Sequence, residues 1–174
     1  MSADFAVDRI RRARAERDRD LRALARLLAA FDDEFDTEHD PEPVLAERFG
    51  RILRSEAAFA LLAAPAGKGR PIGFALVTLR PAIWFDGPVA TLDELYVEPP
   101  RRSAGFGTVL LACIGEELRR RGCPELHINV DEVDADTRRF YERHGLVNVE
   151  REEDGRMLLY TGQVDDLPGA LPPA

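Results

Sequence analysis

An arginine and two glycines within residues 101–108 form the part of the sequence best suited to bind an anion. Arg102 is followed by Gly105 and Gly107, and an apolar stretch with helical spacing begins directly afterwards. Glycine lets a ligand approach backbone N–H groups, and the first turn of a helix adds partial positive charge. The pattern is typical of a phosphate site, although a turn that only enters a helix has the same composition.

Two well-known nucleotide-binding loops share part of this pattern, but each lacks a required residue here. A P-loop carries a lysine after its last glycine, and the stretch GFGTVL has none. A dinucleotide-binding turn needs a third glycine where Leu110 stands, even though Asp131 could supply the acidic residue after the next strand. A different phosphate site and a plain turn therefore remain open.

Hydrophobic periodicity predicts the elements that position this loop. Residues 89–97 alternate as a strand leading into it, and residues 106–118 carry one apolar helical face. Residues 126–131 are expected to form a strand parallel to the first, because a helix joins the two. The other expected elements are an edge strand near Ile10, helices from Asp18 and within 40–53, strands within 57–64 and 71–79, a short helix over 134–145 and a hairpin over 147–160.

This order of elements predicts one mixed α/β domain over residues 1–164, followed by a Pro-rich tail at 165–174. The 174 residues are enough for one ordinary hydrophobic core. No apolar run approaches the ~20 residues of a membrane span, and the first residues lack a signal-peptide core. We therefore expect no membrane association and a cytoplasmic location.

Charge and metal-ligand content narrow the range of partners. A net charge of −8 and an isoelectric point near 5.0 disfavour nucleic acid and mildly favour a cationic substrate. The two cysteines and three histidines are scattered without metal-ligand spacing, so we expect no metal site.

Two longer strings connect the anion-binding pattern to a known family. LDELYVEPPRRSAGFGTVLL resembles motif A of the GCN5-related N-acetyltransferases, and DADTRRFYERHGL resembles their motif B. The resemblance extends over roughly residues 6–162. It implies an α/β fold, with a mixed, mostly antiparallel sheet of about six or seven strands, a splayed central parallel pair and about four helices on the two faces.

The resemblance also implies a cofactor, acetyl-CoA. Backbone groups of Leu95 and Val97 would bind its pantetheine arm, and backbone N–H groups from Arg102 to Gly107 would bind its pyrophosphate. Arg101 would reach the adenosine phosphate, or would simply be a solvated surface arginine. The implied cofactor-binding positions are Leu95, Tyr96, Val97, Arg101, Arg102, Ser103, Ala104, Gly105, Phe106, Gly107, Thr108, Asp134 and Phe140.

Three positions depart from the family pattern. Ser103 stands where a glycine is common, Thr137 where an alanine is common, and Asp134 where an asparagine is common. An ionised aspartate accepts hydrogen bonds but cannot donate one, so we expect Asp134 mainly to cap the short helix that follows it.

The catalytic residues implied by the resemblance are Tyr141, Asp93 and Glu94. Tyr141 occupies the family's general-acid position, although a tyrosine that only packs against the cofactor would look the same. A base must remove a proton from the substrate ammonium. Successive strand residues face opposite sides, so only one of the two carboxylates should reach the site unless the strand bulges, as it commonly does in this family. Resemblance to polyamine acetyltransferases favours Asp93 slightly, and Asp131 is a third candidate.

Weaker signals concern the acceptor. Asp33 and Glu34 belong to the acidic run FDDEFDTEHD, which could attract a cationic amine or could be a solvated loop. Trp84 and Asp86 could bind an amine by cation–π and ionic contacts, or could form a turn and a core contact.

These features together predict transfer of an acetyl group from acetyl-CoA to a primary amine of a small cationic acceptor, such as a polyamine, an aminoglycoside or an amino-acid-like amine. The alternatives are a protein lysine or N-terminal acetyltransferase, a non-catalytic acyl-CoA-binding module and a nucleotide-binding oxidoreductase. The resemblance is compatible with a homodimer, but no residue pattern specifies an interface.

Overall fold

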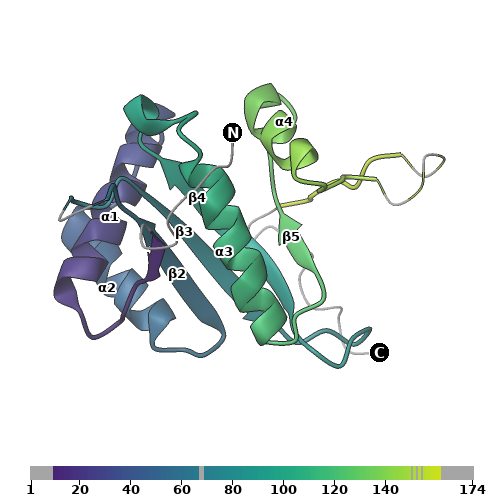
Figure 1. Ribbon diagram of the computed structural model, residues 1–174, viewed down its shortest axis with the longest axis horizontal. Helices are drawn as coiled ribbons and strands as arrows, with labels where there is room; N and C mark the ends of the chain where they lie inside the picture. Colours follow the sequence, from purple (N-terminus) through teal and green to yellow (C-terminus); the bar gives the residue numbers. More distant parts are fainter. Residues whose placement is uncertain (1–9, 67–68, 150, 152, 154, 162–174) are drawn as a thin grey trace, which may run out of the picture. The chain divides into compact units, whose positions relative to one another are not determined.

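The computed structural model describes residues 10–66, 69–149, 151, 153 and 155–161. The chain divides into two compact units, Met1–Ile128 and Asn129–Ala174. Figure 1 shows the first unit as a sheet with helices and the second as a short helix followed by an irregular segment. None of the described helices is long and apolar enough to cross a bilayer.

The first unit contains a five-stranded sheet in which the strands lie in chain order, β1-β2-β3-β4-β5. The pairs from β1 to β4 are antiparallel, whereas β5 runs parallel to β4, as the sequence predicted. The strands are β1 (Ile10–Arg12), β2 (Ala58–Ala63), β3 (Gly73–Arg80), β4 (Val89–Val97) and β5 (Leu126–Ile128).

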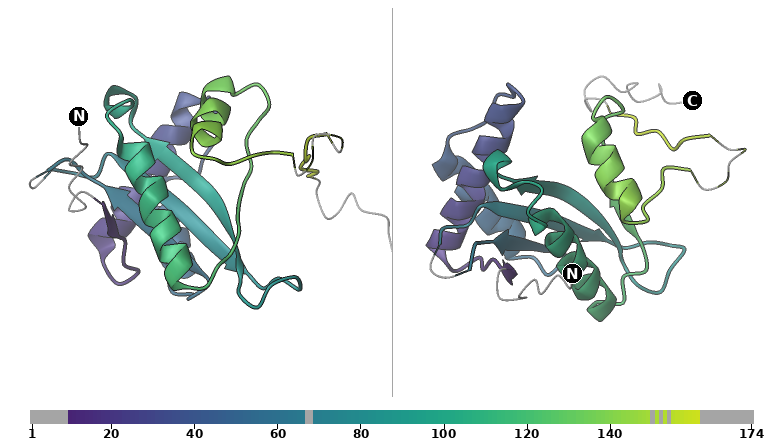
Figure 2. Two further views of the ribbon diagram at one scale, coloured as in Figure 1. Left: turned by 45° about the vertical axis from the view of Figure 1, so that its right-hand side comes forward. Right: turned by 45° about the horizontal axis from the view of Figure 1, so that its top comes forward.

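Helices cover both faces of this sheet. Figures 1 and 2 show α3 (Phe106–Arg120) on one face, with α1 (Asp18–Glu34) and α2 (Glu42–Leu53) on the other. Successive side chains of β2 point to opposite faces of the sheet, so this strand packs against helices on both sides. Leu62 packs into the core beneath α1 and α2, whereas Phe59 points the opposite way and lies under the guanidinium of Arg121, just after α3.

A β-bulge interrupts β4 and reverses the direction of its side chains. Leu92 pairs with Val77 and Glu94 with Leu76, so Asp93 is an extra residue without a partner on β3. Cross-strand partners share a face, and Leu76 belongs to the core beneath α1 and α2. Glu94 therefore faces α1, whereas the alternation without a bulge would put it on the same face as Leu92.

The parallel pairing of β4 with β5 is short. It ends at Leu92 and Ile128, whereas β4 continues to Val97. Within the described part of the first unit, no strand pairs with β4 on that side beyond Leu92. The second half of β4 thus has one backbone edge outside the ladder, directly after the bulge.

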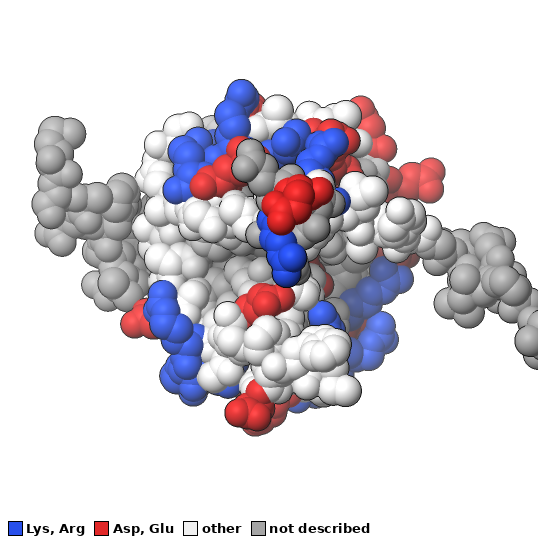
Figure 3. Space-filling view, turned by 90° about the vertical axis from the view of Figure 1, so that its right-hand side faces the viewer, with Lys and Arg blue, Asp and Glu red and all other residues white. Residues whose placement is uncertain are grey.

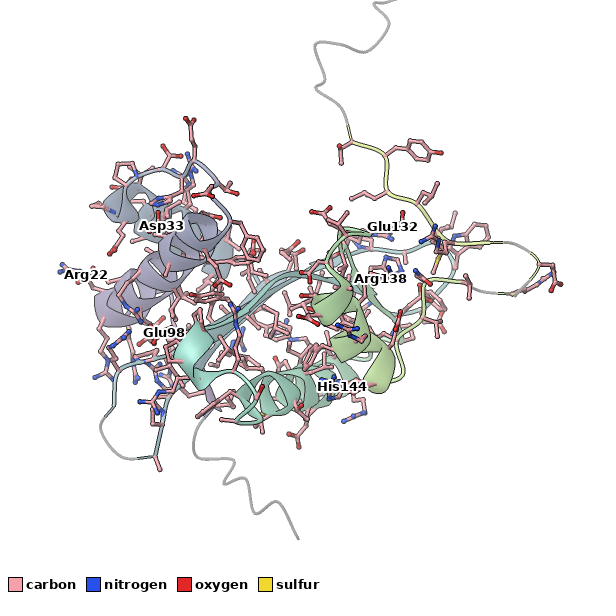
Figure 4. The ribbon with its side chains drawn as sticks, turned by 90° about the horizontal axis from the view of Figure 1, so that it is seen from above. Arg22, Asp33, Glu98, Glu132, Arg138 and His144 are labelled. Atoms are coloured by element: carbon pink, nitrogen blue, oxygen red, sulfur yellow. The ribbon has the colours of Figure 1, made fainter. Side chains whose placement is uncertain are left out.

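The second unit contains α4 (Ala135–Arg143). The side chain of Asp134 caps it by accepting a hydrogen bond from Thr137 N at 3.0 Å, as expected from the sequence. Gly145 closes it with a φ of 83°, a left-handed conformation that favours glycine. Arg138, also in α4, donates to Glu132 O at 3.0 Å, and Figure 4 shows these two residues side by side.

The structure differs from the expected strand count. The described residues contain five strands instead of about six or seven, and β5 ends at Ile128, not Asp131. The expected hairpin over 147–160 has no strand among its described residues, although Met157 N donates to Asn148 O at 2.7 Å. Glu150, Glu152 and Asp154, in the expected turn of this hairpin, lie outside the described residues.

Candidate active site

Glu94 is a carboxylate of the first unit whose pKa is strongly raised. Burial raises its pKa to about 7, and the negative charges of Asp32 and Asp93 contribute to the shift. A carboxylate with this pKa is half ionised near neutral pH, so it can both accept and release a proton there.

Asp93 and Asp32 complete a cluster around Glu94, here called the carboxylate cluster. Burial raises the pKa of Asp93, opposed by a hydrogen bond with the Thr78 side chain. Thr78 lies two residues from Leu76 on β3 and shares its face, so Asp93 lies on the α1 side, and the bulge brings Glu94 to that side as well. Burial also raises the pKa of Asp32. None of the ion pairs among the described residues involves these three carboxylates.

The acidic run at the end of α1 separates into three different environments. Asp32 joins the carboxylate cluster, Asp33 lies 3.2 Å from His39 Nε2, and Glu34 pairs with Arg102. Figure 4 shows Asp33 at the far end of α1 from Arg22. Asp32 is not among the candidate residues that the sequence indicates. Helical periodicity does indicate that Asp32 faces inward, because it follows the buried Ala25 by seven positions and so lies on the same side of α1.

Aromatic side chains border the same end of α1. Tyr96, two residues after Glu94 on the same face, has its ring centre 5.3 Å from that of Phe31. Phe31 in turn packs edge-on against Phe35 at 5.3 Å, and Phe35 is 56% exposed. The exposed ring can cover the apolar part of a ligand whose charged group reaches the carboxylates.

The loop between β4 and α3 has the geometry expected of an anion-binding turn. A short 3₁₀ helix, Pro99–Arg101, is followed by two left-handed residues, Ser103 with φ of 60° and Gly105 with φ of 84°. Gly105 lies directly before α3, whose first intrahelical bond runs from Val109 N to Gly105 O at 3.0 Å. The positive end of the α3 dipole therefore faces the loop.

The side chains of this loop are mostly at the surface. Arg101, Ser103, Ala104 and Thr108 are exposed, whereas Phe106 is buried and anchors the start of α3 in the core. Arg102 is also exposed, yet it contacts Glu34 and the carbonyl oxygen of Val97.

The backbone of β4 after the bulge fits an extended ligand with amide groups. Glu98 N donates to Ile72 O at 2.9 Å, so the backbone groups of Tyr96 also face β3 by the alternation of an antiparallel ladder. The groups of Leu95 and Val97 then point away from β3, to the side where pairing with β5 has stopped. An extended chain of amides such as the pantetheine arm of coenzyme A has the groups to pair with them.

Glu98 fastens this end of β4 to α1. Its carboxylate accepts from Arg26 at 2.8 Å and from Arg70 at 2.5 Å, and Figure 4 shows it close to α1. Burial opposes ionisation, but the two arginines outweigh it and lower the pKa of Glu98. These hydrogen bonds hold the end of β4 against α1.

Trp84 and Asp86 lie in the loop before β4, at the opposite end of the strand from the anion-binding turn. Trp84 is 84% exposed, and Asp86 lines a cavity of about 840 Å³. Five arginines also line this cavity, here called the arginine cavity: Arg12, Arg54, Arg80, Arg120 and Arg121. The structure therefore does not bring Trp84 and Asp86 together with the carboxylate cluster.

The remaining residues singled out from the sequence lie in the second unit. Tyr141 is buried, and its ring packs against that of Phe140 with centres 5.2 Å apart. Asp134 is used as the helix cap, and Asp131 is exposed. No group of three His, Cys, Asp or Glu residues in the described part of the chain is arranged to hold a metal ion.

Comparison with known proteins identifies the family of the chain. Residues 22–146 match the model of the acetyltransferase (GNAT) family. Aminoglycoside N(6')-acetyltransferase type 1 of Klebsiella aerogenes is 38% identical over 78 residues, which cover 44% of this chain and 49% of that protein. The match therefore spans about half the length of this curated relative.

Solved structures extend the similarity to nearly the whole chain. A protein from Arthrobacter sp. FB24, known from a crystal structure, is 40% identical in sequence to this chain. The match covers 94% of this chain and 99% of that protein's chain, and the two structures superpose with a TM-score of 0.81. An aminoglycoside acetyltransferase from an uncultured soil metagenomic sample, solved with sisomicin, shares the fold at a TM-score of 0.69 and 18% identity, covering 88% of this chain and 95% of its own. The family match, the bulged β4 and the turn before α3 agree, and this chain belongs to the acetyltransferase (GNAT) family.

Proposed function

We propose that this protein transfers the acetyl group of acetyl-CoA directly to a primary amine of a small cationic acceptor. The observation that carries the proposal is the carboxylate cluster, in which Glu94 has a pKa of about 7 and no arginine of the described residues forms an ion pair with Asp32, Asp93 or Glu94. A cationic acceptor would supply positive charge to these carboxylates.

The described residues offer a donor site for acetyl-CoA. Leu95 and Val97 would pair with the pantetheine amides, and the backbone from Arg102 to Gly107 would bind the diphosphate at the start of α3. Arg101 and Arg102 add positive charge close to this turn. Acetyl-CoA supplies a thioester with an electrophilic carbonyl carbon and a thiol as leaving group.

The acceptor residues divide the work on the amine. Asp32 and Asp93 would bind the ammonium group, and Glu94 would remove one of its protons, directly or through a water molecule. The free amine then forms the new C–N bond as the C–S bond breaks, and the new amide nitrogen loses its second proton to solvent. Tyr141 is our candidate for donating a proton to the departing sulfur, after which it would regain a proton from solvent.

The similarity to an aminoglycoside acetyltransferase supports a small polycationic acceptor over a protein substrate. The exposed Phe35 beside the cluster would contact the apolar surface of such a molecule. Asp33, beside Asp32 at the end of α1, remains a candidate for a second ammonium group. We propose no contact of the acceptor with Trp84 or Asp86, because they lie at the other end of β4.

The test measures thiol release from acetyl-CoA with a panel of aminoglycosides, polyamines, amino acids and peptides. We expect multiply charged small amines to give the highest kcat/KM. Calorimetry with coenzyme A runs in parallel on wild type and Gly107→Val, which we expect to bind it much more weakly because a side chain there crowds the diphosphate turn. Binding of coenzyme A without thiol release from any amine would instead indicate a non-catalytic acyl-CoA-binding module. Failure of wild type to bind it would overturn the proposed donor.

A further inference from the structure

Arg102 connects the donor loop to the end of α1. Its two terminal nitrogens donate to the two carboxylate oxygens of Glu34, each at 2.7 Å. Its Nε donates to Val97 O at 2.9 Å, and the guanidinium carbon lies 5.6 Å from the centre of the Tyr96 ring. The side chain is therefore folded back onto α1 and β4.

This conformation uses groups that the proposed donor site also needs. The Val97 carbonyl is one of the backbone groups that would pair with the pantetheine arm, and Arg102 already donates to it. The flat edge of the guanidinium is well suited to a diphosphate, and Glu34 already occupies that edge. A carboxylate and a phosphate each accept two parallel N–H groups, so they compete for the same donors.

We propose that Glu34 gates the donor site. In the free protein Glu34 binds the guanidinium of Arg102, and when acetyl-CoA binds, Arg102 leaves Glu34 and binds the diphosphate. The inference rests on the proposed function, because it assumes that the loop binds this donor. The exchange also frees the Glu34 carboxylate two residues from Asp32, so donor binding adds negative charge at the acceptor end of α1. Glu34 is thus a positioning residue that acts through Arg102, and the exchange couples the two substrates.

Calorimetric titration with coenzyme A tests the gate, because the gate predicts that loss of the Glu34 charge raises the affinity for coenzyme A. Glu34→Gln keeps the size of the side chain but weakens its hold on Arg102, so we expect coenzyme A to bind about three to ten times more tightly than to wild type. Glu38→Gln removes the same charge from an exposed residue of the neighbouring segment, and Glu38 has no ion pair with the described residues. We expect that control to change the affinity less than about twofold.

Glu34→Gln in an Arg102→Lys background shows whether the change in coenzyme A affinity depends on Arg102. Lysine keeps the charge but cannot form the two-pronged pair, so adding Glu34→Gln to Arg102→Lys should not tighten binding further. Unchanged or weaker binding by Glu34→Gln alone, or equal tightening by Glu38→Gln, would overturn the gate while leaving the donor assignment intact. A wild type that does not bind coenzyme A would overturn the donor assignment, and the gate with it.

Discussion

The two ends of β4 present opposite arrangements of charge. At the bulge, Asp93 and Glu94 lie near Asp32 of α1, none of the three forms an ion pair with another described residue, and burial raises the pKa of Glu94 to about 7. Beside the arginine cavity, Glu117 of α3 accepts hydrogen bonds from Arg120 and Arg121, each at 2.7 Å. These bonds, led by that of Arg120 and opposed by burial, lower the pKa of Glu117 to about 2.

The difference separates carboxylates that stabilise the fold from carboxylates held ready for a ligand. Glu117 gains its counter-charges within the protein, so its ionised form contributes to stability. Glu94 is kept partly protonated at a cost to stability, and such groups are typical of catalytic sites. Figure 3 shows acidic and basic side chains intermixed on one face of the molecule.

The largest expected effect is on catalysis. Glu94→Gln removes the proposed base, so we expect kcat with the best amine of the panel to fall by about 10²–10³-fold, with little change in coenzyme A affinity. In wild type, kcat/KM should rise with pH around an apparent pKa of about 7. The measurements are steady-state thiol release from pH 5.5 to 9 and calorimetry.

Asp93→Asn is the comparison for this prediction, because it removes a charge from the adjacent residue. If Asp93→Asn abolishes the pH dependence and Glu94→Gln keeps it, the base is Asp93 and our assignment within the carboxylate cluster is wrong.

The next largest effect is expected on stability, at Glu117 and its two arginine partners. Glu117→Gln should lower the free energy of unfolding at pH 7 by about 1–2 kcal/mol, allowing for solvent around the exposed Arg120. The ionised carboxylate has a lower pKa in the native state than its ordinary 4.5, so its stabilisation is present above pH 4.5 and is lost as pH falls toward 2. Urea unfolding at pH 7 and pH 3 measures both, and an equal loss at the two pH values would contradict the charge-based explanation.

Glu94→Gln should have the opposite effect on stability. The native state holds the Glu94 proton up to about pH 7, whereas the unfolded chain loses it near 4.5, so wild-type stability falls as pH rises through this interval. The variant avoids this loss, and we expect it to be more stable than wild type by about 1 kcal/mol at pH 8 and nearly equal at pH 4.5. Thermal unfolding at both pH values checks it; destabilisation at pH 8 would mean that a partner for the ionised form exists.

The smallest effect is expected at the exposed loop before β4. Trp84→Ala should change kcat/KM by less than about twofold and the unfolding free energy by less than about 0.5 kcal/mol, because this side chain is 84% exposed and lies away from the cluster. A tenfold rise in KM for the amine would instead place the acceptor near this loop and would erase the contrast between the two ends of β4.

Local patterns in the sequence predicted the strand, turn and helix that form the donor loop. The alternation of 89–97, the glycines at 105 and 107 and the apolar face of α3 each depend on neighbours a few residues apart. The cap at Asp134 and the closure at Gly145 are equally local, and both were found as expected. The expected hairpin over 147–160 has no strand among its described residues, where a backbone bond from Met157 N to Asn148 O links its two arms.

The sequence by itself determined which residue types were available at the site, namely two adjacent carboxylates on a strand, an acidic helix end and an arginine before two glycines. Only the tertiary structure decided how they combine. The register of β3 against β4 places the bulge at Asp93 and turns Glu94 to the same side as Asp93, toward α1, where packing of the helix brings Asp32 beside them. The same packing joins Glu34 to Arg102, 68 positions away in the chain. Strand register and helix docking are set by burial summed over the whole core, so no short window of sequence contains them.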